Sequence, residues 1–180
     1  MEVQILTTIA GLRSTSLTEL FKIITSFGDL KTVLVLSLVV SLIFLARRKY
    51  VYTKLLLLSL ALDVIIVYSL KLLIQRARPL SDNLLVVEPD FSFPSGHAFI
   101  AVSFYGLLAY LLIKKVKQTW LKLLIATAAI CLILLIGFSR LYLGVHWPSD
   151  VAASLVLATG VVIAITKYFL PVLSNRARLP

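Results

Sequence analysis

The apolar residues of this chain fall into long blocks, not into the alternation of an amphipathic strand or helix. The five clearest blocks hold about 16 residues each and run over 32–46, 55–70, 98–113, 123–138 and 151–166. A bilayer span needs about 20 residues, and Tyr, Trp and Lys side chains at the block ends can supply the rest at the membrane interface. No block has a polar face that would cover it in water. The pattern therefore predicts an all-α, polytopic transmembrane helix bundle of about five spans.

The first 28 residues follow a different pattern. Apolar residues recur at positions 17, 20, 21 and 24, which form one stripe of a helix with charged side chains opposite. Ser14, Thr15 or Ser16 could cap this helix, and Gly28 could end it. We therefore expect residues 1–28 to form an interfacial segment that lies on the membrane. A sixth span arises only if this segment crosses. By length, residues 1–180 are expected to be a single integral membrane domain.

Composition and charge support a membrane protein. The chain is 60% hydrophobic and 14% charged, with a mean hydropathy of +1.01, far from a soluble globular composition. A net charge of +10 could indicate nucleic-acid binding, but its distribution argues against that class of partner. The loops after the first, third and fifth blocks hold 11 of the 18 basic residues and no acidic residue: Arg47, Arg48, Lys49, Lys54, Lys114, Lys115, Lys117, Lys122, Lys167, Arg176 and Arg178.

By the positive-inside rule these basic loops and the C-terminus are cytoplasmic. Seven of the eight acidic residues fall on the other side: Glu2, Glu19, Asp29, Asp82, Glu88, Asp90 and Asp150. Three polar clusters fall on that side as well. We therefore expect a multi-pass protein of the cell (inner) membrane with its polar clusters facing outside.

The first polar cluster holds Lys71 and Arg78-Pro79. If the second helix continues through these residues until Pro79 ends it, the two cations share one face about two turns apart. Two fixed cations could hold phosphate groups, with arginine offering bidentate geometry. The alternative is a pair of ordinary snorkelling cations at a helix end. Arg76 is the better candidate for a simple surface charge.

The second cluster is Pro94-Ser95-Gly96-His97, directly before an apolar block. Ser95 is a candidate N-cap, and Gly96 would let a ligand approach the backbone closely. The free N–H groups of a helix N-terminus favour an anion, and His97 could give a proton to a leaving oxygen near neutral pH. The alternative is an ordinary helix start, which commonly has such residues.

The third cluster joins Arg140, His146 and Asp150. The run 147–150 is typical of a helix start with Pro148 near the first helical position, which would place Asp150 in the first turn beside His146. A carboxylate on one imidazole nitrogen fixes the tautomer and makes the other nitrogen a better nucleophile. Arg140 would neutralise the charge of a pentavalent phosphoryl group. The alternative is a membrane-surface histidine with a capping aspartate.

Asp63 lies in the middle of the second block, eight residues before Lys71. A carboxylate inside a membrane span is a functional candidate by default. It could instead pair with a neighbouring helix, remain protonated, or form a polar floor beneath the site, and these structural roles stay open.

The order K-x6-R-P, P-S-G-H and S-R-x5-H-x3-D, from Lys71 to Asp150, resembles the three-part signature of the type-2 phosphatidic acid phosphatase, or lipid phosphate phosphatase, superfamily. Every core position of the signature is present, and the hydrophobic layout is similar to that of compact bacterial members. Phe27-Gly28-Asp29 is similar to those members too. Soluble vanadate-binding haloperoxidases share the signature, but five apolar spans argue against that branch.

The resemblance implies a role for each matching residue. His146 would attack phosphorus and form a phosphohistidine, Asp150 would orient it, and His97 would protonate the leaving group. The remaining matching residues would bind the phosphate: Lys71, Arg78, Ser95, Gly96 and Arg140. The resemblance implies no metal and no other cofactor.

These observations lead us to expect a lipid phosphatase acting at the outer face of the membrane. Its substrate would be polyprenyl (undecaprenyl) diphosphate, phosphatidylglycerophosphate or phosphatidate. The alternatives within enzymes are a lipid A phosphatase and a lipid phosphotransferase. Outside enzymes the alternative is a lipid transporter, against which the charges gather at one interface and no inverted repeat is visible. The pattern leaves the oligomeric state open.

Overall fold

The computed structural model describes residues 1–79 and 84–176, and every regular element within them is helical, as the sequence predicts. In chain order the helices are α1 (Glu2–Ala10), α2 (Thr15–Ser26), α3 (Leu30–Ala46), α4 (Tyr50–Ile74), α5 (Gly96–Ala101), α6 (Leu107–Ile113), α7 (Thr119–Tyr142), α8 (Pro148–Ala164) and α9 (Leu170–Arg176). Two π-helical turns, η2 (Val102–Gly106) and η3 (Ile165–Phe169), join α5 to α6 and α8 to α9 without a break.

Within the described residues, four helical segments are long and apolar enough to cross a bilayer: Tyr50–Ile74, Gly96–Ile113, Thr119–Tyr142 and Pro148–Leu173. They reach span length because polar residues at the ends of the apolar blocks continue the helices. A fifth span requires α2 and α3 together, which meet at an angle of 49°. At 1.5 Å per residue, α3 alone is about 25 Å long, short of the roughly 30 Å hydrocarbon core. The bundle of about five spans is confirmed in this form.

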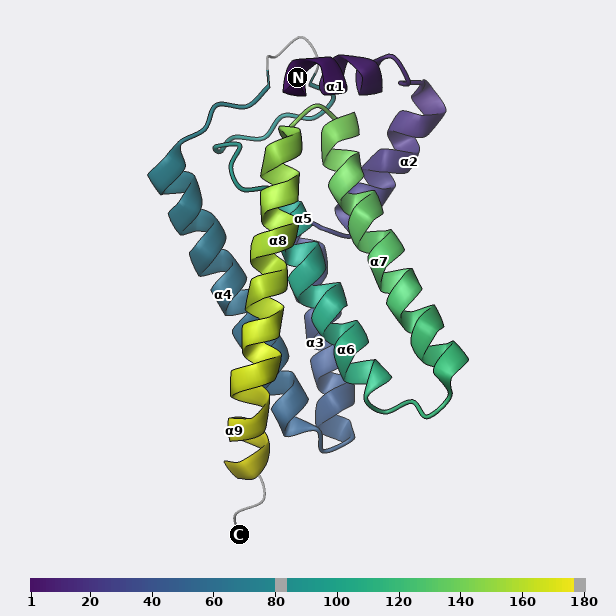
Figure 1. The fold of residues 1–180 in the computed structure, drawn as a ribbon, viewed down its shortest axis with the longest axis vertical. Helices are drawn as coiled ribbons and strands as arrows, with labels where there is room; N and C mark the ends of the chain where they lie inside the picture. The colour runs from purple at the N-terminus through teal and green to yellow at the C-terminus, as the bar shows by residue number, and fades with distance from the viewer. Residues whose placement is uncertain (80–83, 177–180) are drawn as a thin grey trace.

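The N-terminal segment differs in part from the surface-lying helix that its pattern suggests. Helix α1 lies across one end of the bundle, whereas α2 runs down beside α7 (Figure 1). Ser14 is the N-cap of α2 and accepts the N–H of Leu17 at 3.3 Å. Part of the apolar stripe of α2 packs on α7, where the rings of Phe21 and Tyr142 lie 4.4 Å apart, whereas Leu17 and Leu20 are exposed. Such a stripe gains as much by packing on a helix as by facing lipid, so its periodicity alone does not distinguish the two.

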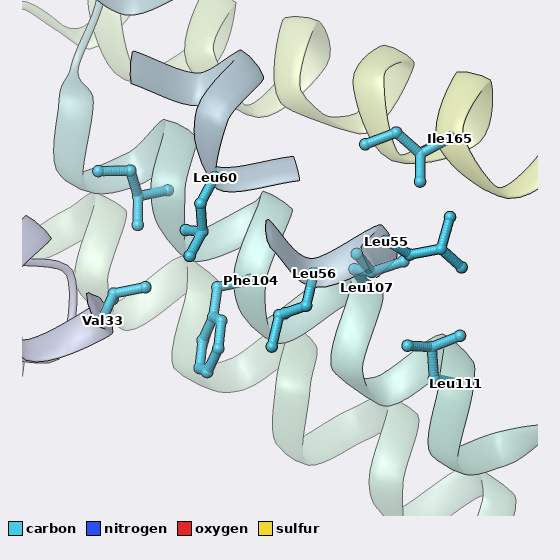
Figure 2. Packing of buried hydrophobic residues seen from close by; sticks show 9 residues of the cluster. Val33, Leu55, Leu56, Leu60, Phe104, Leu107, Leu111 and Ile165 are labelled. Atoms are coloured by element: carbon cyan, nitrogen blue, oxygen red, sulfur yellow. The ribbon is translucent and has the colours of Figure 1, made fainter. Parts of the chain in front are cut away.

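The main apolar core lies where α3, α4, α5, η2, α6 and η3 meet (Figure 2). Its buried residues are Val33, Leu55, Leu56, Leu60, Ile100, Phe104, Leu107, Leu111 and Ile165. The outer faces of the helices are apolar as well, since Leu123, Leu134 and Val156 are exposed. Apolar side chains both inside and outside are what a helix bundle surrounded by lipid requires.

The two ends of the bundle differ in charge. The α3–α4 turn with Arg47–Lys49, the α6–α7 loop with Lys114–Lys117 and the end of α9 lie at one end (Figure 1). Helix α1 and the loops that follow α4 and α7 lie at the other end (Figure 1). The three predicted polar clusters are therefore grouped at a single end, opposite the basic loops. Asp82 and Arg178 lie outside the described residues.

Candidate active site

Lys71 and Arg78 come together, though not by the helical geometry that their spacing suggests. Helix α4 ends at Ile74, and Gln75 takes a left-handed conformation with φ 48°. The expectation that α4 continues to Pro79 is wrong, because the chain turns away at Gln75. Arg78 instead reaches the site from the following loop. The two cations meet at Asp90, whose Oδ2 lies 3.1 Å from Nζ of Lys71 and whose Oδ1 pairs with the guanidinium of Arg78.

Asp90 occupies the point where an anion would bind both cations. The Lys71 ammonium also donates to the carbonyl of Phe91, and Nε of Arg78 donates to the carbonyl of Asp90 at 2.8 Å. Partial burial raises the pKa of Asp90, but the Lys71 charge and the hydrogen bonds from Arg78 and Lys71 outweigh it and hold the pKa below its usual value. Two converging donors of this kind suit a phosphate equally well.

Arg140 reaches the same end from the last turn of α7. Its side chain is 1% exposed. One terminal nitrogen donates to Oγ1 of Thr25 at 2.8 Å, and the other pairs with Glu88. Among the described residues, Nε of Arg140 has no hydrogen-bond partner. A buried guanidinium with a spare donor is costly without further anionic contacts, so this side chain is prepared for an acceptor beyond Glu88.

His146 and Asp150 meet at the start of α8. Pro148 is the first helical residue, as predicted, and Oδ2 of Asp150 accepts the N–H of Trp147 at 2.9 Å. Ser92 also donates to this oxygen. Nδ1 of His146 lies 3.5 Å from the same oxygen, slightly long for a hydrogen bond, and only a small shift separates the two groups from one.

The second ring nitrogen of His146 faces a cation. Nε2 lies 3.4 Å from a terminal nitrogen of Arg78, which also donates to the Val145 carbonyl at 2.6 Å. A guanidinium can only donate, so this contact favours a lone pair on Nε2 and the proton on Nδ1, towards Asp150. Burial, with the nearby Arg140 and Arg78 charges, lowers the pKa of His146 to about 4, although the neighbouring Asp150 carboxylate acts in the opposite direction. The ring is therefore neutral at ordinary pH.

The P-S-G-H cluster lies at the start of α5. His97 Nε2 is 2.6 Å from Oδ1 of Asp29. Ser95 occupies the N-cap position, but its hydroxyl makes no capping bond; it is buried and has no partner among the described residues. At Gly96 an added Cβ would meet only a Val67 methyl at 3.7 Å, so protein packing does not demand glycine there. A buried hydroxyl without a partner and an uncovered backbone fit a site for an anion.

Arg76 departs from the surface charge that we expect from the sequence. One of its terminal nitrogens donates to Oδ1 of Asp150 and to Oγ of Ser149, each at 2.6 Å, and the other binds Glu2 at 2.7 Å. Glu2 also accepts from the backbone N–H of Ser149 at 3.0 Å. Arg76 thus links α1 to the carboxylate beside His146. The contact with Asp150 joins residues 74 positions apart, and no local pattern reveals it. The sequence does not predict the site contacts of Glu88, Asp90 and Ser92 for the same reason.

Asp63 lies away from this end, within α4. It is buried, and neither carboxyl oxygen has a hydrogen-bond partner among the described residues. Over the same residues no group of three or more His, Cys, Asp or Glu side chains is arranged to hold a metal ion.

Comparison with known proteins identifies the family. Residues 52–172 match the family described as the PAP2 superfamily. Phosphatidylglycerophosphatase B of Bacillus subtilis (strain 168) is 35% identical over 141 residues, which are 78% of this chain and 69% of that protein. An undecaprenyl-diphosphatase of Sulfolobus acidocaldarius is 32% identical over 123 residues, 66% of this chain and 54% of the relative.

The fold comparison agrees. The crystal structure of a transmembrane PAP2 type phosphatidylglycerolphosphate phosphatase from Bacillus subtilis superposes with a TM-score of 0.86 at 30% identity, covering 92% of this chain and 82% of that one. The family match spans all three polar clusters, from Lys71 to Asp150. The chain therefore belongs to the PAP2 superfamily and is a multi-pass membrane phosphatase of that family, acting on lipid phosphates.

Proposed function

We propose that this enzyme hydrolyses a phosphate monoester or diphosphate of a membrane lipid, without a metal, through a phosphohistidine on His146. The observation that carries the proposal is the orientation of that ring. Nδ1 faces the Asp150 carboxylate and Nε2 faces the Arg78 guanidinium. A neutral imidazole held this way presents its lone pair to an anion bound by the surrounding cations.

The first chemical step forms the phosphoenzyme. Lys71, Arg78 and Arg140 bind the phosphate oxygens in place of Asp90 and Glu88, and Ser95 with Gly96 adds hydroxyl and backbone donors. Nε2 of His146 attacks phosphorus, the bond from phosphorus to the leaving oxygen breaks, and His97 gives that oxygen a proton. Asp150 stabilises the charge that develops on the His146 ring. Fixed cations stabilise the pentavalent transition state because they need little reorganisation.

The second step returns the enzyme to its starting state. His97, now neutral, takes a proton from water as the water oxygen bonds to phosphorus. The bond from phosphorus to Nε2 breaks, inorganic phosphate leaves, and His146 regains its lone pair. One histidine thus serves as acid and then as base, as microscopic reversibility requires.

An amphiphilic substrate fits the surroundings of the site. An apolar groove of about 270 Å³ runs between α6 and α7, lined by Leu108, Leu112, Ala128 and Leu132 among others. It begins at Tyr105, whose hydroxyl contacts the Phe27 carbonyl beside Asp29 and His97. A lipid chain could lie there while its phosphate reaches the cations. The relatives make phosphatidylglycerophosphate and undecaprenyl diphosphate the first substrates to test.

The test is phosphate release in detergent with EDTA present. Phosphatidylglycerophosphate, undecaprenyl diphosphate and phosphatidate are each given to the wild type, to His146→Asn and to Lys122→Gln, the last a control at the opposite end of the bundle. We expect release by the wild type and the control alone, and inhibition by vanadate, which mimics pentavalent phosphorus. Full activity of His146→Asn, or activity that chelation abolishes and Mg²⁺ restores, would overturn the mechanism.

We also propose that the site faces the outside of the cell membrane. The support is the separation of the basic loops from the polar clusters along the bundle. Once Cys131 is replaced by serine, a new cysteine can be placed at Glu19 or at Lys115 and treated on intact cells with a membrane-impermeant maleimide. Labelling at position 19 but not at 115 is expected, and the reverse pattern would invert the topology.

A further inference from the structure

The break between α2 and α3 places a carboxylate against the second histidine of the site. Oδ1 of Asp29 lies 2.6 Å from Nε2 of His97. The His97 side chain is 17% exposed and that of Asp29 is 48% exposed, so the ring is largely buried while water reaches the carboxylate. The catalytic steps described above do not involve Asp29.

The turn that carries Asp29 is held tightly against α5 and η2. A Cβ added to Gly28 would lie 3.1 Å from Cβ and 3.2 Å from the carbonyl oxygen of His97. The Tyr105 hydroxyl donates to the Phe27 carbonyl at 2.8 Å. The absence of a side chain at Gly28 thus allows an approach that any other residue would obstruct, and this approach sets the position of Asp29.

Asp29 does not serve its own helix. It occupies the N-cap position of α3, where an aspartate normally accepts a backbone N–H of the first turn. Its side chain makes no such bond and turns to His97 instead. A local stabilising role therefore does not explain the carboxylate.

We propose that Asp29 is the positioning residue of the acid histidine. By accepting a hydrogen bond from Nε2–H, the carboxylate stabilises the imidazolium and leaves Nδ1 as the nitrogen that faces the leaving oxygen. The Nδ1 proton passes to that oxygen as its bond to phosphorus breaks and the bond from phosphorus to Nε2 of His146 forms. Asp29 keeps the Nε2 hydrogen bond throughout. The inference rests on the proposed phosphatase mechanism and gives the site two His–Asp pairs, one for the nucleophile and one for the acid.

Leaving-group dependence tests this role. Asp29→Asn is assayed on the lipid phosphate, whose alkoxide or phosphate leaving group needs a proton, and on p-nitrophenyl phosphate, whose phenolate does not. Because general acid catalysis contributes about 10²–10⁴-fold, we expect kcat/KM to fall about 10–100-fold on the lipid and about threefold or less on the aryl ester. The ratio of the two losses is independent of the fraction of folded protein in the sample.

Two further variants complete the experiment. In the His97→Ala background, Asp29→Asn should add no further loss on the lipid, because residues that act as a unit are not additive. Glu19→Gln, which removes an exposed carboxylate that pairs with Lys22, should retain wild-type values on both substrates. Equal losses on both substrates, or an additive loss with His97→Ala, would overturn this inference alone. Failure of the wild type to release phosphate would overturn the proposed function and this inference with it.

Discussion

Arg76 donates a 2.6 Å hydrogen bond to Oδ1 of Asp150, the carboxylate whose other oxygen faces His146. Oδ2 is already shared by Ser92, the Trp147 N–H and the histidine ring. Asp150 is therefore held at both oxygens, and its orientation toward His146 depends on partners from the loop after α4. The loop after α4 thus contributes to the site as much as the helices do. The other terminal nitrogen of Arg76 binds Glu2 and so connects α1 to this loop.

We predict that Arg76→Ala lowers kcat/KM about tenfold or more, because a hydrogen bond to a charged group contributes about 1.5–3 kcal/mol. The loss should appear as slower phosphoenzyme formation in a rapid-quench measurement, since the nucleophile loses its alignment. Glu2→Gln, which leaves the Arg76–Asp150 contact in place, should have a smaller effect. Arg47→Ala at the opposite end of the bundle is the control. Wild-type phosphorylation rates in Arg76→Ala would show that Asp150 needs no support from this residue.

The protonation of His146 offers a second test. Burial lowers its pKa to about 4, so the neutral, nucleophilic form persists well below the ordinary value of about 6.5. The chain has only two histidines, so in tag-free His97→Asn the ¹⁵N signal of histidine belongs to His146 alone. We expect its NMR titration to have a midpoint near pH 4, with neutral-imidazole shifts retained at pH 5.5. A midpoint near 6.5 would mean that water and neighbouring charges stabilise the imidazolium in the folded enzyme.

The sequence predicts the helices well because hydropathy is a local property. The blocks within α4, α7 and α8 are so apolar that only lipid or a large protein core could surround them. The stripe of α2 is ambiguous, since packing of Phe21 on Tyr142 produces the same period as a membrane surface. The sequence does not predict the end of α4, because Gln75 is an ordinary helix former that takes a left-handed conformation with φ 48°. The residues beside it carry no helix-stop signal.

For the site, sequence motifs reveal the residues but not all of their partners. His146 and Asp150 are four residues apart, so the start of α8 brings them together and spacing predicts their contact. The contacts of Arg76 with Asp150 and of Asp29 with His97 join residues 74 and 68 positions apart. Those pairings depend on how the helices of the bundle pack, and a local sequence pattern does not determine that packing.

Gly28 provides a test of that packing. An added Cβ would lie 2.7 Å from Cγ2 of Ile136 as well as close to His97. We predict that Gly28→Ala lowers the free energy of unfolding by about 1–3 kcal/mol, the usual range for overpacking, and lowers kcat/KM because Asp29 shifts. Gly160→Ala is the matched control, since nothing lies within 4 Å of its added Cβ. Thermal unfolding in detergent measures both variants.

A second substitution separates the contact of the Gly28→Ala Cβ with Ile136 from its contact with His97. Ile136→Ala removes Cγ2, so combining it with Gly28→Ala should relieve the side-chain clash while the contact with His97 remains. Because Ile136 is itself buried, its truncation alone also costs stability; the expected result is a loss of stability in the double variant that is smaller than the sum of the two single losses, without recovery of kcat/KM. Equal thermal stability of Gly28→Ala and Gly160→Ala would show that the turn can move away from α5 at little cost.

The pairing of Glu88 with Arg140 leads to a prediction about anion binding. The guanidinium is 1% exposed, and its Nε lacks a partner among the described residues, so Glu88 supplies much of the compensation for a buried charge. Glu88→Gln should destabilise the enzyme, because leaving a buried charge unpaired typically costs about 3–5 kcal/mol. An anion that reaches Arg140 should then restore part of the loss, since a ligand stabilises the state that binds it.

We therefore expect vanadate or phosphate to raise the melting temperature of Glu88→Gln more than that of the wild type, with tighter inhibition by vanadate. Glu19→Gln, which removes an exposed carboxylate that pairs with Lys22 and not with Arg140, should show the wild-type shift. If vanadate stabilises Glu88→Gln and the wild type equally, Glu88 does not compete with the anion, and the phosphate must contact the guanidinium through the spare Nε while Glu88 stays in place.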